Sequence, residues 1–181
     1  MPHIQLPDGL PGIVGAFAFR PETAKPMRAL AEVLLRAPGS LTSGEREMIA
    51  AFVSTGNDCH FCQASHRAAA AYHLDGNYDL VDAVRTDYQN APVGPKLKAL
   101  LGIAAKVRRS GKDVTAEDVA HARREGATDL EIHDTVLIAA AFCMYNRYVD
   151  GLATLTPVDA RQYDAMGARM AAQGYVREET K

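Results

Sequence analysis

The sequence predicts an all-α fold, a multi-helix bundle in a single domain. Alanine is abundant, and alternating β-branched runs bounded by turn residues are absent. Helix-capping patterns also recur just before apolar segments. The chain has 181 residues, of which 48 % are hydrophobic and 23 % charged, so it is long enough for one domain with a sizeable core.

The N-terminal region is expected to be irregular and the rest of the chain helical. Residues 1–21 contain four of the nine prolines, and we interpret them as an irregular arm that precedes a helical domain over residues 22–181. The first helix should run from about Glu22 to Ala37. Because proline lacks a backbone N–H and clashes with the preceding turn, Pro26 should break or kink this helix.

Capping boxes and stop residues predict the later helices. Thr42 and Glu45 open a second helix that should end near Gly56, and a third should extend from about Cys59 to Leu74. The remaining helices are predicted by the same signals, two of them by further threonine caps, over residues 78–88, 94–109, 115–126, 128–152 and 157–174.

The third predicted helix opens on a dense group of reactive side chains. Cys59, His60 and Cys62 lie within four positions, and His66 follows one turn after Cys62. Glu47 lies twelve residues before Cys59, on the preceding helix. A hairpin of the two helices would place this carboxylate near the thiols, where it could accept a proton.

The spacing of these residues favours thiol redox chemistry. Cys62 and His66 are an i, i+4 pair, so the imidazole can reach that thiol. A helix N-terminus and a neighbouring histidine both favour the reactive thiolate form. A C-x-x-C pair also fits one helical turn, so one thiolate can attack a peroxide and the other thiol can close a disulfide.

The pattern Glu47-x11-Cys59-x2-Cys62-x3-His66 resembles the motif of the alkyl hydroperoxidase D-like proteins, within the carboxymuconolactone decarboxylase superfamily. Chain length, the Ser-Thr-Gly-Asn-Asp approach to Cys59 and a later segment, residues 146–151, resemble the peroxidase-related branch. The likeness covers roughly residues 20–175. It implies an all-α AhpD-like bundle, a homo-oligomer and a cofactor-free thiol peroxidase that acts on a hydroperoxide.

The resemblance also implies roles for the four motif residues. Cys62 would be the peroxidatic cysteine, and Cys59 the resolving thiol and proton donor. Glu47 and His66 would form the proton relay, and an external dithiol or a partner peroxidase would exchange electrons with the site. The hydroperoxidase proper carries a histidine immediately before its second cysteine, whereas this chain has Phe61 there and His60 one position earlier.

Other interpretations of the same residues remain open. The dithiol could pass electrons to a separate peroxidase without itself reducing peroxide. Cys59, Cys62 and His66, with Glu47 or His60, could instead hold zinc in a redox- or metal-responsive interaction protein. Lactone decarboxylation fits poorly because it leaves the thiols without a task, and a pair of buried structural cysteines is the least specific alternative.

Outside the motif, we expect structural roles. Cys143 lies in an apolar run and should be a buried core cysteine. Asn146, Arg147 and Asp150 could line the entrance to the site or hold a subunit contact, but a structural role is favoured. The formal net charge of −2 argues against nucleic-acid binding. The sequence lacks a signal peptide and a long apolar run, so we expect a cytoplasmic protein without membrane attachment.

Overall fold

The computed structural model describes residues 1–176, and every regular element within them is helical. The predicted all-α fold class is therefore confirmed. The elements follow one another along the chain as α1 (Ile13–Phe19), α2 (Pro21–Arg36), α3 (Ser43–Gly56), α4 (His60–His73), α5 (Tyr78–Asp87), α6 (Pro95–Arg109), the short 3-10 helix η1 (Gly111–Asp113), α7 (Ala116–Arg124), α8 (Asp129–Gly151) and α9 (Ala160–Gln173).

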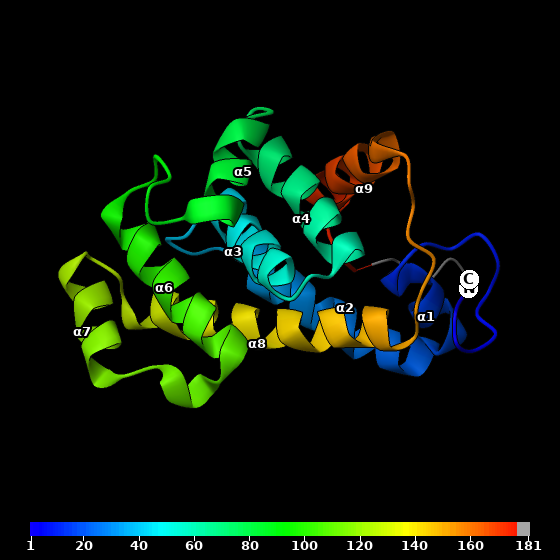
Figure 1. The fold of residues 1–181 in the computed structure, drawn as a ribbon, viewed down its shortest axis with the longest axis horizontal. Coiled ribbons are helices and arrows are strands. Elements are labelled where there is room, and N and C mark those ends of the chain that lie inside the picture. Colours follow the sequence, from blue (N-terminus) through cyan, green and yellow to red (C-terminus); the bar gives the residue numbers. More distant parts are fainter. Residues whose placement is uncertain (177–181) are drawn as a thin grey trace.

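The long helix α8 runs along the longest dimension of the molecule (Figure 1). Helices α3 and α6 both pack against it, and α4 lies beside α3 as the second arm of a hairpin. Helix α9 packs on α4, so α4 lies between α3 and α9. Helices α6 and α7 occupy one end of the molecule, and α1 lies at the other (Figure 1).

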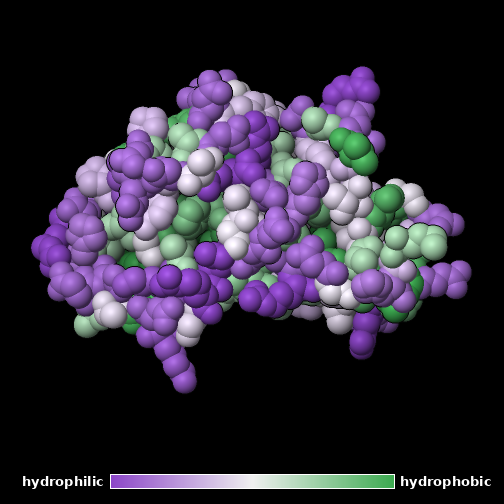
Figure 2. Space-filling view, in the orientation of Figure 1, coloured by the Kyte–Doolittle hydropathy of each residue, from purple (hydrophilic) through white to green (hydrophobic). Residues whose placement is uncertain are grey.

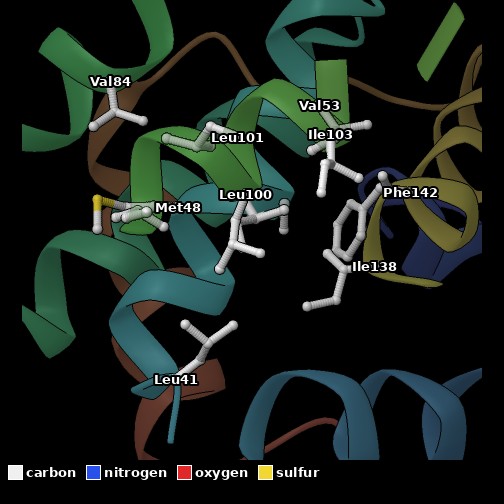
Figure 3. Close-up of a cluster of buried hydrophobic side chains, with 14 of the residues drawn as sticks. Leu41, Met48, Val53, Val84, Leu100, Leu101, Ile103, Ile138 and Phe142 are labelled. Atoms are coloured by element: carbon white, nitrogen blue, oxygen red, sulfur yellow. The ribbon is translucent and has the colours of Figure 1, made fainter. Parts of the chain in front are cut away.

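The main hydrophobic core lies between α3, α6 and α8 (Figure 3). Met48 and Val53 from α3 meet Leu100 from α6 and Ile138 and Phe142 from α8, and all five side chains are buried. Burial of one such side chain contributes about 1.5–3 kcal/mol to folding. This packing fixes α3 relative to α8, and therefore also fixes the α3–α4 hairpin that carries the motif.

A buried arginine ties three parts of the chain together. The Arg46 guanidinium donates hydrogen bonds to the carbonyl oxygens of Leu34, at 3.1 Å, and Leu41, at 3.2 Å. It also lies 3.7 Å from the Asp134 carboxylate. Because a buried cation needs partners for its donors, these contacts hold the end of α2 and the following loop against α3 and α8.

The capping signals predicted the helix starts correctly. Thr42, Thr115 and Thr128 each form a capping box at the start of α3, α7 and α8, in which the threonine side chain accepts from the backbone N–H three residues later. A threonine cap is typically worth about 1 kcal/mol. The local hydrogen bonds at these three positions therefore favour the same helix starts that the folded chain adopts.

One prediction near the N-terminus is wrong, and of the break or kink expected at Pro26 the break does not occur. The segment expected to be irregular contains α1, because its apolar face packs on α2 and α8 and buries Ala16 and Phe17. Tertiary packing therefore stabilises a helix too short to persist alone. Nor is the first long helix broken at Pro26, since α2 continues from Pro21 to Arg36 with the proline inside it.

Helices α4 and α9 cross so closely that no side chain fits at Gly167. A Cβ atom there would lie 2.5 Å from Ala68 Cβ and 2.6 Å from the Ala68 carbonyl carbon. We expect Gly167→Ala to push α9 away from α4 and to lower the free energy of unfolding by about 1–3 kcal/mol. Chemical denaturation measures this change.

Gly151→Ala is the matched control for this prediction. Gly151 is also a glycine within a helix, but a Cβ there would meet no atom within 4 Å. Since alanine is the better helix former by up to about 1 kcal/mol, this variant should be neutral or slightly more stable. Equal stability of the Gly167 and Gly151 variants would contradict the predicted close crossing.

The surface is mostly polar on the face shown in Figure 2, where exposed hydrophobic residues are interspersed with hydrophilic ones. Exposed apolar side chains include Phe19 on α1 and Val158 in the loop before α9. Within residues 1–176, no helix has both the length and the apolar character needed to cross a membrane.

Candidate active site

A tight connection between α3 and α4 places the first cysteine. The chain leaves α3 through Asn57 and Asp58, and the Cys59 N–H donates to Ser54 O at 3.1 Å. Asp58 has a φ of 58°, a left-handed conformation that aspartate and asparagine adopt more readily than most residues. This sharp turn sets Cys59 at the N-cap of α4 and folds α4 back along α3.

The two cysteines lie together at the start of α4, as free thiols in a dry environment. Cys59 is 0 % exposed and Cys62 is 4 % exposed. A hydrogen bond from the Cys59 thiol to Cys62, together with burial, raises the pKa of Cys59 above its usual value. Cys59 is therefore the thiol that favours its protonated form.

The hairpin brings Glu47 of α3 against His66 of α4. His66 Nδ1 lies 2.7 Å from Glu47 Oε2, and the carboxylate is 1 % exposed. Because Nδ1 is engaged by Glu47, Nε2 is the ring nitrogen left for another partner. Phe142 of α8 presents its ring edge to the imidazole at a centroid distance of 4.6 Å and restricts its orientation further.

Cys62 and His66 line the same apolar cavity, which has a volume of about 80 Å³. Its walls come from α1, α2, α4, α8 and α9, so elements distant in the sequence converge on Cys62. Phe61, Phe142 and Met166 contribute apolar surface, and Cys59 does not line the cavity. A small apolar molecule in this space would lie near both Cys62 and His66, which are one turn apart on α4.

Aromatic side chains close the region around the thiols. The Tyr163 ring lies 6.1 Å from the Phe61 ring, and its hydroxyl donates to Pro157 O at 2.9 Å. Burial, and secondarily the nearby cysteine sulfurs, raise the pKa of Tyr163. Gly12, with a φ of 53°, passes directly over the Phe61 ring, where a Cβ would clash. The N-terminal segment, residues 1–21, therefore helps to exclude water from the cysteines.

Tyr175 is a site residue that our sequence analysis missed. Its hydroxyl donates to Glu47 Oε1, the carboxylate oxygen not used by His66, and its ring stacks on the His66 imidazole at 6.1 Å with an interplanar angle of 10°. Tyr175 lies just beyond α9, 128 residues from Glu47. No local motif connects positions so far apart in the sequence. The nearest sequence signal is Gly174, a residue type that commonly ends a helix, directly before Tyr175.

Comparisons with known proteins agree with this arrangement. The family model for the carboxymuconolactone decarboxylase family matches residues 21–73, a segment that spans α2 to α4 and includes all four motif residues. A crystal structure described as an alkylhydroperoxidase AhpD core, an uncharacterized peroxidase-related protein from Ralstonia eutropha, is 30 % identical and superposes with a TM-score of 0.77. The match covers 87 % of this chain and 81 % of that one.

The chain is an AhpD-like member of the carboxymuconolactone decarboxylase superfamily. An uncharacterized peroxidase-related protein from Silicibacter sp. is also similar, with 26 % identity, a TM-score of 0.80, and coverage of 92 % of this chain and 95 % of that one. A protein of unknown function from Agrobacterium tumefaciens, described as a putative antioxidant defence protein AhpD, shares the fold at 19 % identity. Its TM-score is 0.70, with 82 % and 99 % coverage. No curated protein matches the sequence.

The later segment of this AhpD-like chain holds helices together. The Asn146 amide is buried, accepts from Asn57 Nδ2 at 2.8 Å and donates to Ser54 Oγ at 3.0 Å. It thus fixes the end of α3 just before the Cys59 turn. Arg147 is exposed and donates to the Cys143 carbonyl at 2.9 Å, so neither residue lines the cavity.

Cys143 and His60 also differ from the motif cysteines in their surroundings. Cys143 is half-buried rather than fully buried, and its sulfur lies 3.4 Å from Asn57 Nδ2. The predicted core cysteine thus does pack against the main core, but it is less buried than expected. His60 is exposed and packs edge-on against Tyr163 at 5.8 Å. It does not line the cavity that contains Cys62 and His66.

The part of the chain that the structure describes offers no group of three histidine, cysteine or acidic side chains arranged to hold a metal ion. Glu47 and His66 face one another, whereas Cys59 and Cys62 face one another at the start of the helix. The zinc hypothesis therefore has no ligand set within residues 1–176.

Proposed function

We propose that this protein is a thiol-dependent hydroperoxide reductase that uses Cys62 as the peroxidatic cysteine. The observation that carries the proposal is the cavity in which Cys62 and His66 meet, with His66 hydrogen-bonded to the buried Glu47. Because the cavity walls are mainly apolar, the substrate class that fits is a small organic hydroperoxide. The printed descriptions of the similar structures, peroxidase-related and AhpD, support the same function.

In the first step, His66 Nε2 takes the Cys62 proton and the thiolate attacks the terminal peroxide oxygen. The O–O bond breaks, sulfur is oxidised by two electrons to sulfenic acid, and the peroxide is reduced to an alcohol that leaves with the proton from His66. Glu47 stabilises the imidazolium formed in this step, as a carboxylate does in other triads.

In the second step, Cys59 resolves the sulfenic acid. The Cys59 sulfur attacks Cys62, its proton and the hydroxyl leave as water, and a Cys59–Cys62 disulfide forms. Cys59 is the N-cap residue of α4, and Cys62 lies in the first turn of the same helix. The two sulfurs therefore need only a small movement to bond. An external dithiol small enough to enter the cavity then reduces the disulfide by exchange at Cys62, and a reducing compartment such as the cytoplasm would supply it.

A dithiol oxidoreductase that serves a separate peroxidase is the second candidate. It would have to present the dithiol to a protein disulfide, yet Cys59 is 0 % exposed and Cys62 is 4 % exposed. The burial of both thiols therefore favours a small peroxide over a protein partner.

We also propose that the working form is a homo-oligomer, as the resemblance to the AhpD-like proteins implies.

Competing oxidants distinguish these two functions. We expect the reduced protein to be oxidised by tert-butyl hydroperoxide much faster than by a small protein disulfide at equal concentration, as followed by the loss of free thiols. Because both oxidants draw on the same dithiol, Cys62→Ser is the control for each. Faster oxidation by the protein disulfide would favour the oxidoreductase and overturn the proposal.

A further inference from the structure

We propose that Tyr175, carried by the segment after α9, is a positioning residue that holds Glu47 in register with His66. This inference rests on the proposed function, because it concerns the relay that activates Cys62. The observation behind it is that the two carboxylate oxygens of Glu47 have different partners, His66 on one and the Tyr175 hydroxyl on the other.

The Tyr175 hydroxyl satisfies the carboxylate oxygen that His66 leaves unused. A buried carboxylate is costly unless its oxygens accept hydrogen bonds, and donors to the charged form stabilise it. Without Tyr175, one oxygen of Glu47 would lie in a nearly dry site with no hydrogen-bond donor from residues 1–176. The carboxylate would then be free to rotate or to take up a proton, and either change weakens its support of His66.

The Tyr175 ring makes a second, independent contact with the relay. It lies nearly parallel to the imidazole, and Phe142 contacts the same imidazole edge-on. The His66 ring thus contacts two aromatic rings while Nδ1 lies 2.7 Å from Glu47 Oε2. This arrangement leaves Nε2 as the nitrogen that can exchange a proton with Cys62 in the cavity.

The surroundings of Tyr175 keep it a donor. Burial, and secondarily the Glu47 charge, raise the pKa of Tyr175 well above its usual value, and Glu32 adds to this while Arg36 opposes it. The hydroxyl therefore stays protonated over the working pH range of a thiol enzyme. A tyrosine in this state can position Glu47 but does not act as a base.

Helix α2 holds the segment that carries Tyr175. The Tyr175 N–H donates to Glu32 Oε2 at 2.6 Å, and Arg28 donates to the Tyr175 carbonyl at 3.3 Å.

Helix α2 also holds the end of α9, because Arg36 donates to the Met170 and Ala171 carbonyls. Gly174, with a φ of 79°, allows the backbone to turn toward α2. These contacts fix the position of the hydroxyl over Glu47.

Tyr175→Phe tests this role because it removes the hydroxyl and keeps the ring. We expect the second-order rate constant for Cys62 oxidation by tert-butyl hydroperoxide to fall roughly tenfold, the effect of losing one hydrogen bond to a charged group. We also expect the midpoint of the pH profile for iodoacetamide alkylation of Cys62 to move to higher pH, because the relay stabilises the thiolate less well. A purely structural role for Tyr175 would not shift this midpoint.

Tyr148→Phe is the matched control, since its hydroxyl donates to Ala16 O at 3.4 Å, outside the cavity lining. A Tyr175→Phe profile that coincides with wild type, or moves to lower pH, would overturn the inference while leaving peroxide reduction intact. Slow oxidation of the wild-type protein would instead contradict the proposed function. If Tyr175→Phe does not fold, Glu32→Ala, which loosens the Tyr175 backbone, should produce the same shift to a smaller extent.

Discussion

Cys59→Ser is expected to react with a hydroperoxide and then stop at a sulfenic acid on Cys62, whereas Cys62→Ser should not react. Cys62 lines the cavity and has the relay beside it, but Cys59 is fully buried behind it and its pKa is raised. The serine hydroxyl in Cys59→Ser can still donate to the Cys62 thiolate. The rate of the first step should therefore stay within about tenfold of wild type, the scale of one altered hydrogen bond.

Trapping with dimedone measures this difference. After peroxide treatment, Cys59→Ser should gain one dimedone adduct by intact mass, and peptide mapping should place it on Cys62. Wild type should gain little, because the disulfide forms before the trap can react. Cys143→Ser, which alters the half-buried third thiol, should behave as wild type. An adduct on Cys59 in the Cys62→Ser protein would reverse the assigned roles.

Glu47→Gln should slow the first step by roughly two to four orders of magnitude, the usual contribution of a positioned acid–base group. Glutamine has the shape of glutamate but carries no charge and has one acceptor oxygen. It cannot accept from both His66 and the Tyr175 hydroxyl, so one of these two donors loses its partner. The imidazolium formed when Cys62 loses its proton is also no longer neutralised.

Stopped-flow measurement of Cys62 oxidation checks this prediction, with thermal denaturation to show that the variant is folded. Glu117→Gln is a suitable control because Glu117 is exposed on α7 and pairs with Arg124 away from the cavity. A folded Glu47→Gln protein that reacts as fast as wild type would remove Glu47 from the relay and leave His66 as the only proton acceptor.

Much of the fold is predictable because it depends on local signals. The capping boxes at Thr42, Thr115 and Thr128 mark helix starts that the structure reproduces. Helix α1 is different, since its short apolar sequence between two prolines becomes helical only through packing on α2 and α8. Pro26 is similarly misleading, because α2 continues through it from Pro21 to Arg36 although a proline inside a helix usually breaks it.

The site also combines contacts that local spacing predicts with contacts that only tertiary packing creates. The i, i+4 spacing of Cys62 and His66 lies within one helix, so the sequence is sufficient to bring these residues together. The contact of Glu47 with His66 requires the hairpin, whose sharp turn at Asp58 is only suggested by residue type. Tyr175 reaches Glu47 through the packing of α9 on α4 and the hydrogen bonds to α2, and no pattern in the sequence encodes that meeting.

The most direct test of the account is the rate at which fully reduced, metal-free protein forms the Cys59–Cys62 disulfide with an organic hydroperoxide. Intact mass records the loss of two hydrogens, and rapid quenching gives the time course. We predict oxidation far faster than that of a free thiol under the same conditions, because the thiolate, relay and resolving cysteine are already in place. Oxidation no faster than a free thiol would contradict the central claim that this site reduces peroxides.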